Sequence, residues 1–165
     1  MKTYATLILF LLTITQFAFS QSAGEKESVM KPVKQLFEAM QKGDSAMLRK
    51  AFAKQVTLDN VGADKAGKLV FKHETSLDGF AKAIGTPHPD AYNEVIWDEK
   101  VEIDGNFAQA WMSYAFYLGK KFIHCGVDAF HLAKGDDGNW RIFHLADTRQ
   151  KEGCKIPQKI SDQFK

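Results

Sequence analysis

Two histidines, a cysteine and an aspartate fall within eight residues, HCGVDAFH, at positions 124–131. Imidazole and carboxylate groups are the side chains that most often transfer protons in enzymes. Because Val127 and Ala129 flank Asp128, an ionised carboxylate there would be poorly solvated, and its pKa would rise unless it is paired. Such a group suits proton abstraction or hydrogen bonding to a ligand. It could equally accept hydrogen bonds that only fix the core.

Strand geometry limits which of these groups can act together. The stretch belongs to KFIHCGVDAFHLA, which has the composition of a β-strand. Along a strand, His124 and Asp128 are about 13 Å apart at roughly 3.3 Å per residue, too far for a direct pair. His144 on the next strand is a diagonal neighbour of Asp128, at about 7 to 8 Å between backbones. Asp128 with His144 is therefore the better acid and base candidate, and His124 is the third.

Three helices are expected from the spacing of apolar residues and from capping signals. The first covers residues 25–41, where apolar residues recur every three or four positions, and Pro32 fits only in its first turn. A second helix, capped by Asp44 or Ser45, runs to about Ala53. The stretch LDGFAKAI forms a third.

The remaining segments predict strands. Residues 55–60 and 68–74 form a strand pair, and four long strands follow from residue 94, joined by the turns DGN, GK and GDDG. Short connections make these four strands antiparallel neighbours. The fold class is therefore α+β, with N-terminal helices packed on a mainly antiparallel sheet. Residues 151–165 are expected to form a loosely packed polar tail.

The turns GK and DDG set the register of the last three strands. In this register Asp128 lies opposite Trp111, and Phe130 lies opposite His144. One face then combines large aromatic side chains with small and polar ones, as a ligand cavity does. Its predicted ligand-binding residues are Trp111, Ser113, Tyr117, Phe122, Gly126, Phe130 and Trp140, beside the catalytic candidates Asp128, His124 and His144. The opposite face is smoother and suits packing or a dimer.

The first twenty residues, MKTYATLILFLLTITQFAFS, indicate a secretory signal peptide cleaved after Ser20. A membrane anchor is the competing interpretation. The apolar run is shorter than the roughly 20 residues of a spanning helix and is interrupted by Thr13, Thr15 and Gln16. We therefore expect an exported protein, periplasmic or secreted, with no membrane association after cleavage. Residues 21–150 suit one domain.

Charge and ligand geometry exclude some partners. Cleavage removes one of 22 basic residues, Lys2, and none of 20 acidic ones, leaving a net charge of +1. This balance predicts no nucleic-acid partner. A metal ion needs at least three converging ligands, and only His124, Asp128 and His144 share a face, at separations that are too large. No metal or cofactor is expected.

The two cysteines, Cys125 and Cys154, leave the redox state open. Export permits a disulfide between them. Whether it forms depends on where the C-terminal tail packs. Asp147 and Arg149, two residues apart on one side of a strand, suit a local ion pair or a dimer contact.

The order of elements, with particular stretches, resembles the nuclear transport factor 2-like superfamily. The stretches are VKQLFEAMQKGDSAMLRKAF, SLDGFAKAIGTPHP, AWMSYAFYLGKKFIHCGVDAFHLAKGDDGNWRI and LADTR, and they look like its exported bacterial, SnoaL-like branch described as putative lumazine-binding. The resemblance covers residues 28–150. It implies a strongly curved sheet forming a cone with an internal apolar cavity, and frequent dimerisation through the outer face of the sheet. Relatives of this type include ketosteroid isomerases, dehydratases and polyketide cyclases.

Three functions follow as hypotheses. The first is an exported domain that binds a small apolar or aromatic molecule, oriented by Asp128 and His124. The second is a cofactor-independent isomerase, dehydratase or cyclase in which Asp128 abstracts a proton and His124 or His144 assists. The third is a non-catalytic module that acts as a homodimer through protein contacts.

Overall fold

The structure is a computed structural model that describes residues 23–64 and 66–165, so the predicted signal peptide, residues 1–20, lies outside the described residues. A long N-terminal helix covers residues 23–42. The elements that follow are α2 (Ser45–Ala51), β1 (Phe52–Ala63), β2 (Leu69–Glu74), α3 (Asp78–Gly85), β3 (Tyr92–Asp104), β4 (Phe107–Leu118), β5 (Lys121–Lys134), β6 (Trp140–Thr148), α4 (Gln158–Ser161) and a 3₁₀ turn, η1 (Asp162–Phe164).

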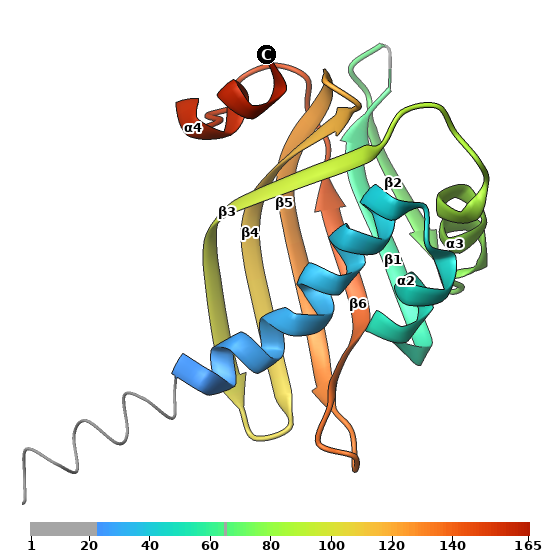
Figure 1. The fold of residues 1–165 in the computed structure, drawn as a ribbon, viewed down its shortest axis with the longest axis vertical. Helices are drawn as coiled ribbons and strands as arrows, with labels where there is room; N and C mark the ends of the chain where they lie inside the picture. Colours follow the sequence, from blue (N-terminus) through green and yellow to red (C-terminus); the bar gives the residue numbers. More distant parts are fainter. Residues whose placement is uncertain (1–22, 65) are drawn as a thin grey trace, which may run out of the picture.

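The sheet of the described chain has six strands in the order β2-β1-β6-β5-β4-β3, and the N-terminal helices pack on one of its faces (Figure 1). Strand β1 runs parallel to β6, whereas the other neighbouring strands are antiparallel. The sheet is therefore mixed, with a meander from β3 to β6. The α+β class expected from the sequence is confirmed.

The long helix buries an apolar stripe against the sheet. Val29, Val33 and Leu36 are at most 1% exposed, which is the spacing of one helical face. The helix runs through Pro32, so the expectation that this proline lies in the first turn is wrong. Burial of apolar side chains on both sides of the proline offsets the loss of its backbone hydrogen bond.

The junction between the first two helices follows the local chemistry. Gly43 ends the long helix with a positive φ of 67°, a conformation that favours glycine. The Asp44 side chain then accepts a hydrogen bond from the Met47 backbone N–H at 2.8 Å and caps α2. The predicted cap is confirmed, and α2 ends at Ala51 rather than near Ala53.

Two β-bulges change the register that the turns impose. Next to the β4–β5 turn, Leu118 pairs with Lys121 as predicted, but Ile123 is an extra residue and Phe116 pairs with His124. In the β5–β6 pair, Phe143 is the extra residue. Each bulge shifts the pairing by one residue, so the predicted faces of β4 and of the later part of β6 are inverted.

The corrected register changes the neighbours of Asp128. It lies opposite Met112 on β4 and Asp147 on β6, not opposite Trp111. Likewise, Phe130 lies opposite Leu145 rather than His144. The side chains of Asp128 and Met112 therefore point to the helix-covered face of the sheet.

The C-terminal segment is packed against the sheet rather than loose. Cys154 forms a disulfide with Cys125, with their Cα atoms 6.1 Å apart, which answers the question that the sequence left open. The Phe164 ring stacks on Tyr117, with ring centroids 3.8 Å apart, and Ile160 is 3% exposed. The segment therefore covers the outer face of β4 and β5 at their shared turn.

Gly126 allows an unusually close approach between strands. A Cβ atom at this position would overlap the Thr148 carbonyl oxygen, which also accepts a hydrogen bond from the Tyr114 hydroxyl at 2.8 Å. Only glycine leaves room for this arrangement.

We therefore expect Gly126→Ala to lower the free energy of unfolding by about 2 to 3 kcal/mol, because the backbone of β6 would have to move. Urea denaturation monitored by circular dichroism measures this change. Gly24→Ala is the control, since an added Cβ there meets no atom within 4 Å. Equal stabilities for the two variants would contradict the prediction.

Candidate functional site

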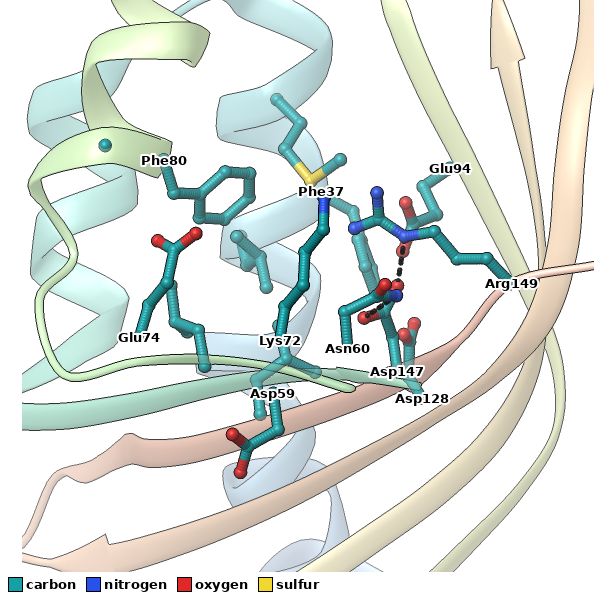
Figure 2. Close-up of a pocket in the computed structure, with 15 residues that line it drawn as sticks. Phe37, Asp59, Asn60, Lys72, Glu74, Phe80, Glu94, Asp128, Asp147 and Arg149 are labelled. Atoms are coloured by element: carbon teal, nitrogen blue, oxygen red, sulfur yellow. Dashed lines mark hydrogen bonds and ion pairs between the residues drawn. The ribbon is translucent and has the colours of Figure 1, made fainter. Parts of the chain in front are cut away.

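A pocket of about 480 Å³ lies between the helices and the sheet. The long helix and α3 supply apolar side chains, whereas the polar ones come from β1, β2, β3 and β5, and from β6 with Arg149 just beyond its end (Figure 2). The lining residues are Leu36, Phe37, Met40, Leu58, Asp59, Asn60, Lys72, Glu74, Gly79, Phe80, Glu94, Asp128, Leu145, Asp147 and Arg149. Glu94, Asp128, Asp147 and Arg149 gather at one end of the pocket, and Phe80 and Glu74 lie at the other.

Two carboxyl groups meet at the polar end. Asp128 is 2% exposed, and no N–H or hydroxyl group of the described residues donates to its Oδ2 atom. The carboxyl group of Glu94 on β3 lies beside it, and the two groups are coupled electrostatically. Two ionised carboxylates in so poorly solvated a place repel each other, which favours a protonated form of the pair.

The same burial changes how these groups ionise. Burial, followed by the charge of Glu94, raises the pKa of Asp128 well above its ordinary value. Burial raises the pKa of Glu94 to about 7, although its hydrogen bond to Asp128 opposes that rise. The pair therefore holds a proton at a pH where isolated carboxyl groups are ionised.

Asp147 organises the wall beside this pair. It accepts hydrogen bonds from Arg149 Nε at 2.6 Å and from Asn60 Nδ2 at 2.9 Å. Tyr114, which is 1% exposed, places its hydroxyl 3.4 Å from Asp147 Oδ2, and burial raises the pKa of this hydroxyl. Among the described residues, the Nη groups of Arg149 make no hydrogen bond to protein, so they are available to a ligand oxygen.

His124 lies near this site but does not line the pocket. Its ring packs edge-on against Tyr114 and Phe116, with centroids 5.6 and 5.1 Å away, and its buried Nδ1 has no partner in the described chain. Burial, then the charge of Arg149, lowers the pKa of His124 to about 4. The ring is therefore neutral at pH 7.

His144 lies on the other face of the sheet and does not meet Asp128. Its Nε2 lies 3.0 Å from Asp59 Oδ2, and its Nδ1 lies 2.9 Å from His131 Nδ1. Asp59 also contacts His73 Nδ1 at 2.6 Å. The bulge at Phe143 is the reason, because it turns His144 outward.

The predicted ligand-binding residues are dispersed, and of the whole predicted set only Asp128 lines the pocket. Trp111 is 51% exposed, and it lies with Ser113 on the outer face. Phe130 and Trp140 are buried in the main core.

The other two predicted aromatic residues lie in a separate cluster. Tyr117 and Phe122 pack with the disulfide and with Phe164 under the C-terminal segment. Gly126 does not line the pocket. Its lack of a side chain allows the backbone of Thr148 to lie close to it.

Sequence reasoning missed Glu94 as a member of the site. A bulge between Trp97 and Lys100, where Asp98 has a φ of 56°, shifts the β3 register and turns Glu94 inward. No turn signal marks this bulge. Asp147 and Arg149 were expected to form either an ion pair or a dimer contact. The structure contains the ion pair and places both residues in the pocket wall, which the sequence did not predict.

Two kinds of feature, a metal-binding cluster and a membrane-spanning helix, have no counterpart in the part of the chain that the structure describes. Across residues 23–64 and 66–165, no group of three or more His, Cys, Asp or Glu side chains is arranged to hold a metal ion. Within those ranges, no helix is long and apolar enough to cross a membrane. The arrangement that is present can transfer a proton or bind a polar group beside the apolar side chains of the long helix and α3.

The fold and pocket define a nuclear transport factor 2-like domain. Three of the solved structures that share this fold serve as examples. An NTF2-like protein of unknown function from Shewanella baltica is 23% identical, with a TM-score of 0.59, 79% of this chain covered and 97% of that one. An NTF2-like protein from Novosphingobium aromaticivorans is 12% identical, with a TM-score of 0.65, and the match covers 90% of this chain and 94% of that one. A putative ketosteroid isomerase from Shewanella frigidimarina is 22% identical, with a TM-score of 0.55, and the match covers 73% of this chain and 94% of that one.

Within this superfamily, the family model described as "Putative lumazine-binding" matches residues 24–144, and the chain belongs to that family. No curated protein matches the chain.

The raised pKa of Glu94 predicts a pH-dependent stability. A carboxyl group with a raised folded-state pKa binds more protons in the folded state, so its contribution is fully present below the unfolded pKa, near 4.5. That contribution is lost as pH rises through about 7. We expect the wild type to lose on the order of 2 to 3 kcal/mol from this source between pH 5 and 8.

Urea denaturation at pH 5 and pH 8 checks this prediction. Glu94→Gln should lose less stability over the interval than the wild type does. Glu99→Gln, at an exposed position of the same strand, is the matched control and should behave as the wild type. A Glu94→Gln variant with the wild-type pH dependence would show that Glu94 is not the responsible group.

Proposed function

We propose that this protein is an exported domain that binds a small, partly aromatic molecule in the pocket of about 480 Å³. The observation that carries the proposal is the Asp128–Glu94 carboxyl pair in that pocket, where none of the described residues donates an N–H or hydroxyl group to Asp128 Oδ2. A buried polar group without a partner is costly, and a ligand that supplies one recovers this cost. In this proposal the sheet and helices form a cone around the ligand.

The chemistry of the walls indicates which ligands fit. Phe37 and Phe80 offer aromatic surface to a flat ring, and Met40 adapts to its shape. The carboxyl pair accepts an N–H, and Arg149 donates to an oxygen. A cyclic imide, in which an N–H lies between two carbonyl groups, complements this pattern. Lumazine, the compound in the family's description, is a fused aromatic ring system with such an imide.

Proton transfer is the alternative function for the same pocket. A carboxyl group of raised pKa, such as Asp128, can abstract a proton next to a ligand carbonyl near neutral pH. Glu94 would supply the second carboxyl group, and Arg149 or Tyr114 would stabilise the resulting oxyanion. His124 is separated from the pocket by Tyr114, and His144 lies on the outer face of the sheet. Neither histidine therefore takes part directly in this reaction.

Export is part of the proposal. The signal-like residues 1–20 motivate it, and the Cys125–Cys154 disulfide is consistent with an oxidising compartment, either periplasmic or extracellular. Mass spectrometry of the protein secreted by its native host would detect an N-terminus at Gln21 if the segment is removed.

Binding can be tested with lumazine as the probe. Fluorescence titration should show saturable binding to the wild type, and Asp128→Asn should weaken it at least tenfold, because an amide cannot hold the shared proton. The Asp128→Asn variant should also be at least as stable as the wild type at pH 8, since it removes a poorly solvated acid. Glu102→Gln, an exposed change on β3, is the control.

The outcomes separate the roles of Asp128. An Asp128→Asn variant that melts well below the wild type would make the carboxyl group structural and overturn the proposal. Native mass spectrometry of the purified protein covers ligands other than lumazine. Absence of a retained small molecule together with no response to lumazine would count against a binding function.

We also propose that two copies associate through the outer face of the sheet. Four large apolar side chains on that face, as placed by the strand pairing, are exposed: Leu69 (71%), Phe71 (62%), Phe107 (43%) and Trp111 (51%). Such a concentration of exposed apolar side chains on one face is typical of an interaction surface.

Trp111→Glu should convert the dimer to a monomer, because it buries a charge in the interface. Light scattering after size-exclusion chromatography measures the mass. Lys50→Glu, exposed on α2 at the helix side, should leave the dimer intact. A wild type that is monomeric at all accessible concentrations would disprove the proposal.

A further inference from the structure

A second hollow, of about 600 Å³, adjoins the pocket behind Glu94 and Phe37. These two side chains line both spaces, so they form the partition between them. The other walls come from the long helix, the start of β3, the β4–β5 turn and the C-terminal segment, through Glu38, Gln41, Asn93, Val95, Gly119, Lys120, Gln163 and Phe164. Glu94 is thus approached from two sides, whereas Asp128 lines only the first pocket.

The C-terminal segment, residues 155–165, supplies the outer wall of this hollow. It lies at the end of the sheet where the β4–β5 turn is found (Figure 1). Lys120 Nζ donates a hydrogen bond to the Lys165 carbonyl oxygen at 2.7 Å, and Phe164 stacks on Tyr117. Gln163 and Phe164 then face the partition formed by Glu94 and Phe37.

This segment depends on its anchors. Its helical pieces are four and three residues long, too short to be stable by themselves. What holds the segment in place is the Cys125–Cys154 disulfide at its start, the buried Ile160 side chain and the stacked Phe164 ring near its end. A segment fixed covalently at one end and by a few side chains at the other can open without unfolding the domain.

We propose that residues 155–165 form a lid over a second entrance to the ligand pocket, with Glu94 and Phe37 as the inner gate. The proposal rests on the proposed function in that the pocket takes a ligand. The disulfide keeps the lid close to its seat, and the stacking of Phe164 on Tyr117 keeps it closed. Opening the lid admits water to the rear of Glu94 and lets a ligand leave without passing Lys72 and Arg149.

Hydrogen exchange measured by mass spectrometry tests the lid without any ligand. Phe164→Ala should raise amide exchange in residues 92–97 and 117–122 at least tenfold, while residues 29–34 of the long helix, which line neither space, stay at the wild-type rate. Cys154→Ser, which removes the covalent anchor, should give the same local pattern. Lys159→Ala, an exposed change within the lid, is the matched control and should exchange as the wild type.

The results discriminate between a lid and a structural brace. If Phe164→Ala and Cys154→Ser match the control, the segment does not gate this entrance. If exchange rises equally in residues 29–34, the segment is structural. Either result overturns the proposal. Lumazine dissociation, measured by stopped-flow fluorescence, should be at least threefold faster in Phe164→Ala. Failure of lumazine to bind would affect the proposed function alone, because the exchange pattern tests the lid independently.

Discussion

The contact between the buried carboxyl groups of Asp128 and Glu94 is the interaction on which the site depends. Two carboxylates in a poorly solvated space repel each other, and sharing a proton removes that cost. The fold creates the contact by placing β3 and β5 on either side of β4, with both carboxyl groups pointing toward the helices. The long helix packs over this part of the sheet and helps to bury them, so the same packing that stabilises the domain raises the pKa of both groups.

Three β-bulges decide which side chains reach that space. The bulges at Ile123, at Phe143 and between Trp97 and Lys100 each add one residue to a strand. Beyond each bulge, the side chains that would have faced solvent face the pocket, and the reverse. Glu94 therefore enters the pocket while His144 leaves it. The positions of the bulges therefore determine which polar side chains face the pocket.

Much of the fold could be predicted from the sequence because its signals are local. The apolar spacing of the long helix, the Asp44 cap and the Gly138 turn each depend on a few adjacent residues, and the structure contains all three. Asp128 was identified for the same reason, since its apolar neighbours Val127 and Ala129 mark a buried carboxyl group.

The rest of the site depends on register, which is not local. A bulge carries no distinctive residue at Ile123 or Phe143, so counting outward from a correct turn gives the wrong face within a few positions. Glu94 is 34 positions from Asp128 in sequence, and nothing near it signals the pairing. The course of the C-terminal segment was also beyond local signals, because the disulfide and the stacking of Phe164 on Tyr117 depend on distant residues.

Strand β5 connects the interior of the pocket with the outer covering of the sheet. Side chains alternate along a strand, so His124, Gly126 and Asp128 point inward while Cys125 points outward. The disulfide therefore holds the C-terminal segment to the strand that carries the principal carboxyl group, three residues away. Gly126, between them, lets the backbone of β6 approach closely enough for the Tyr114 hydroxyl to bond Thr148. The covering of the sheet at Cys125 and the wall that bears Asp147 and Arg149 are therefore joined by a short series of tight contacts centred on Gly126.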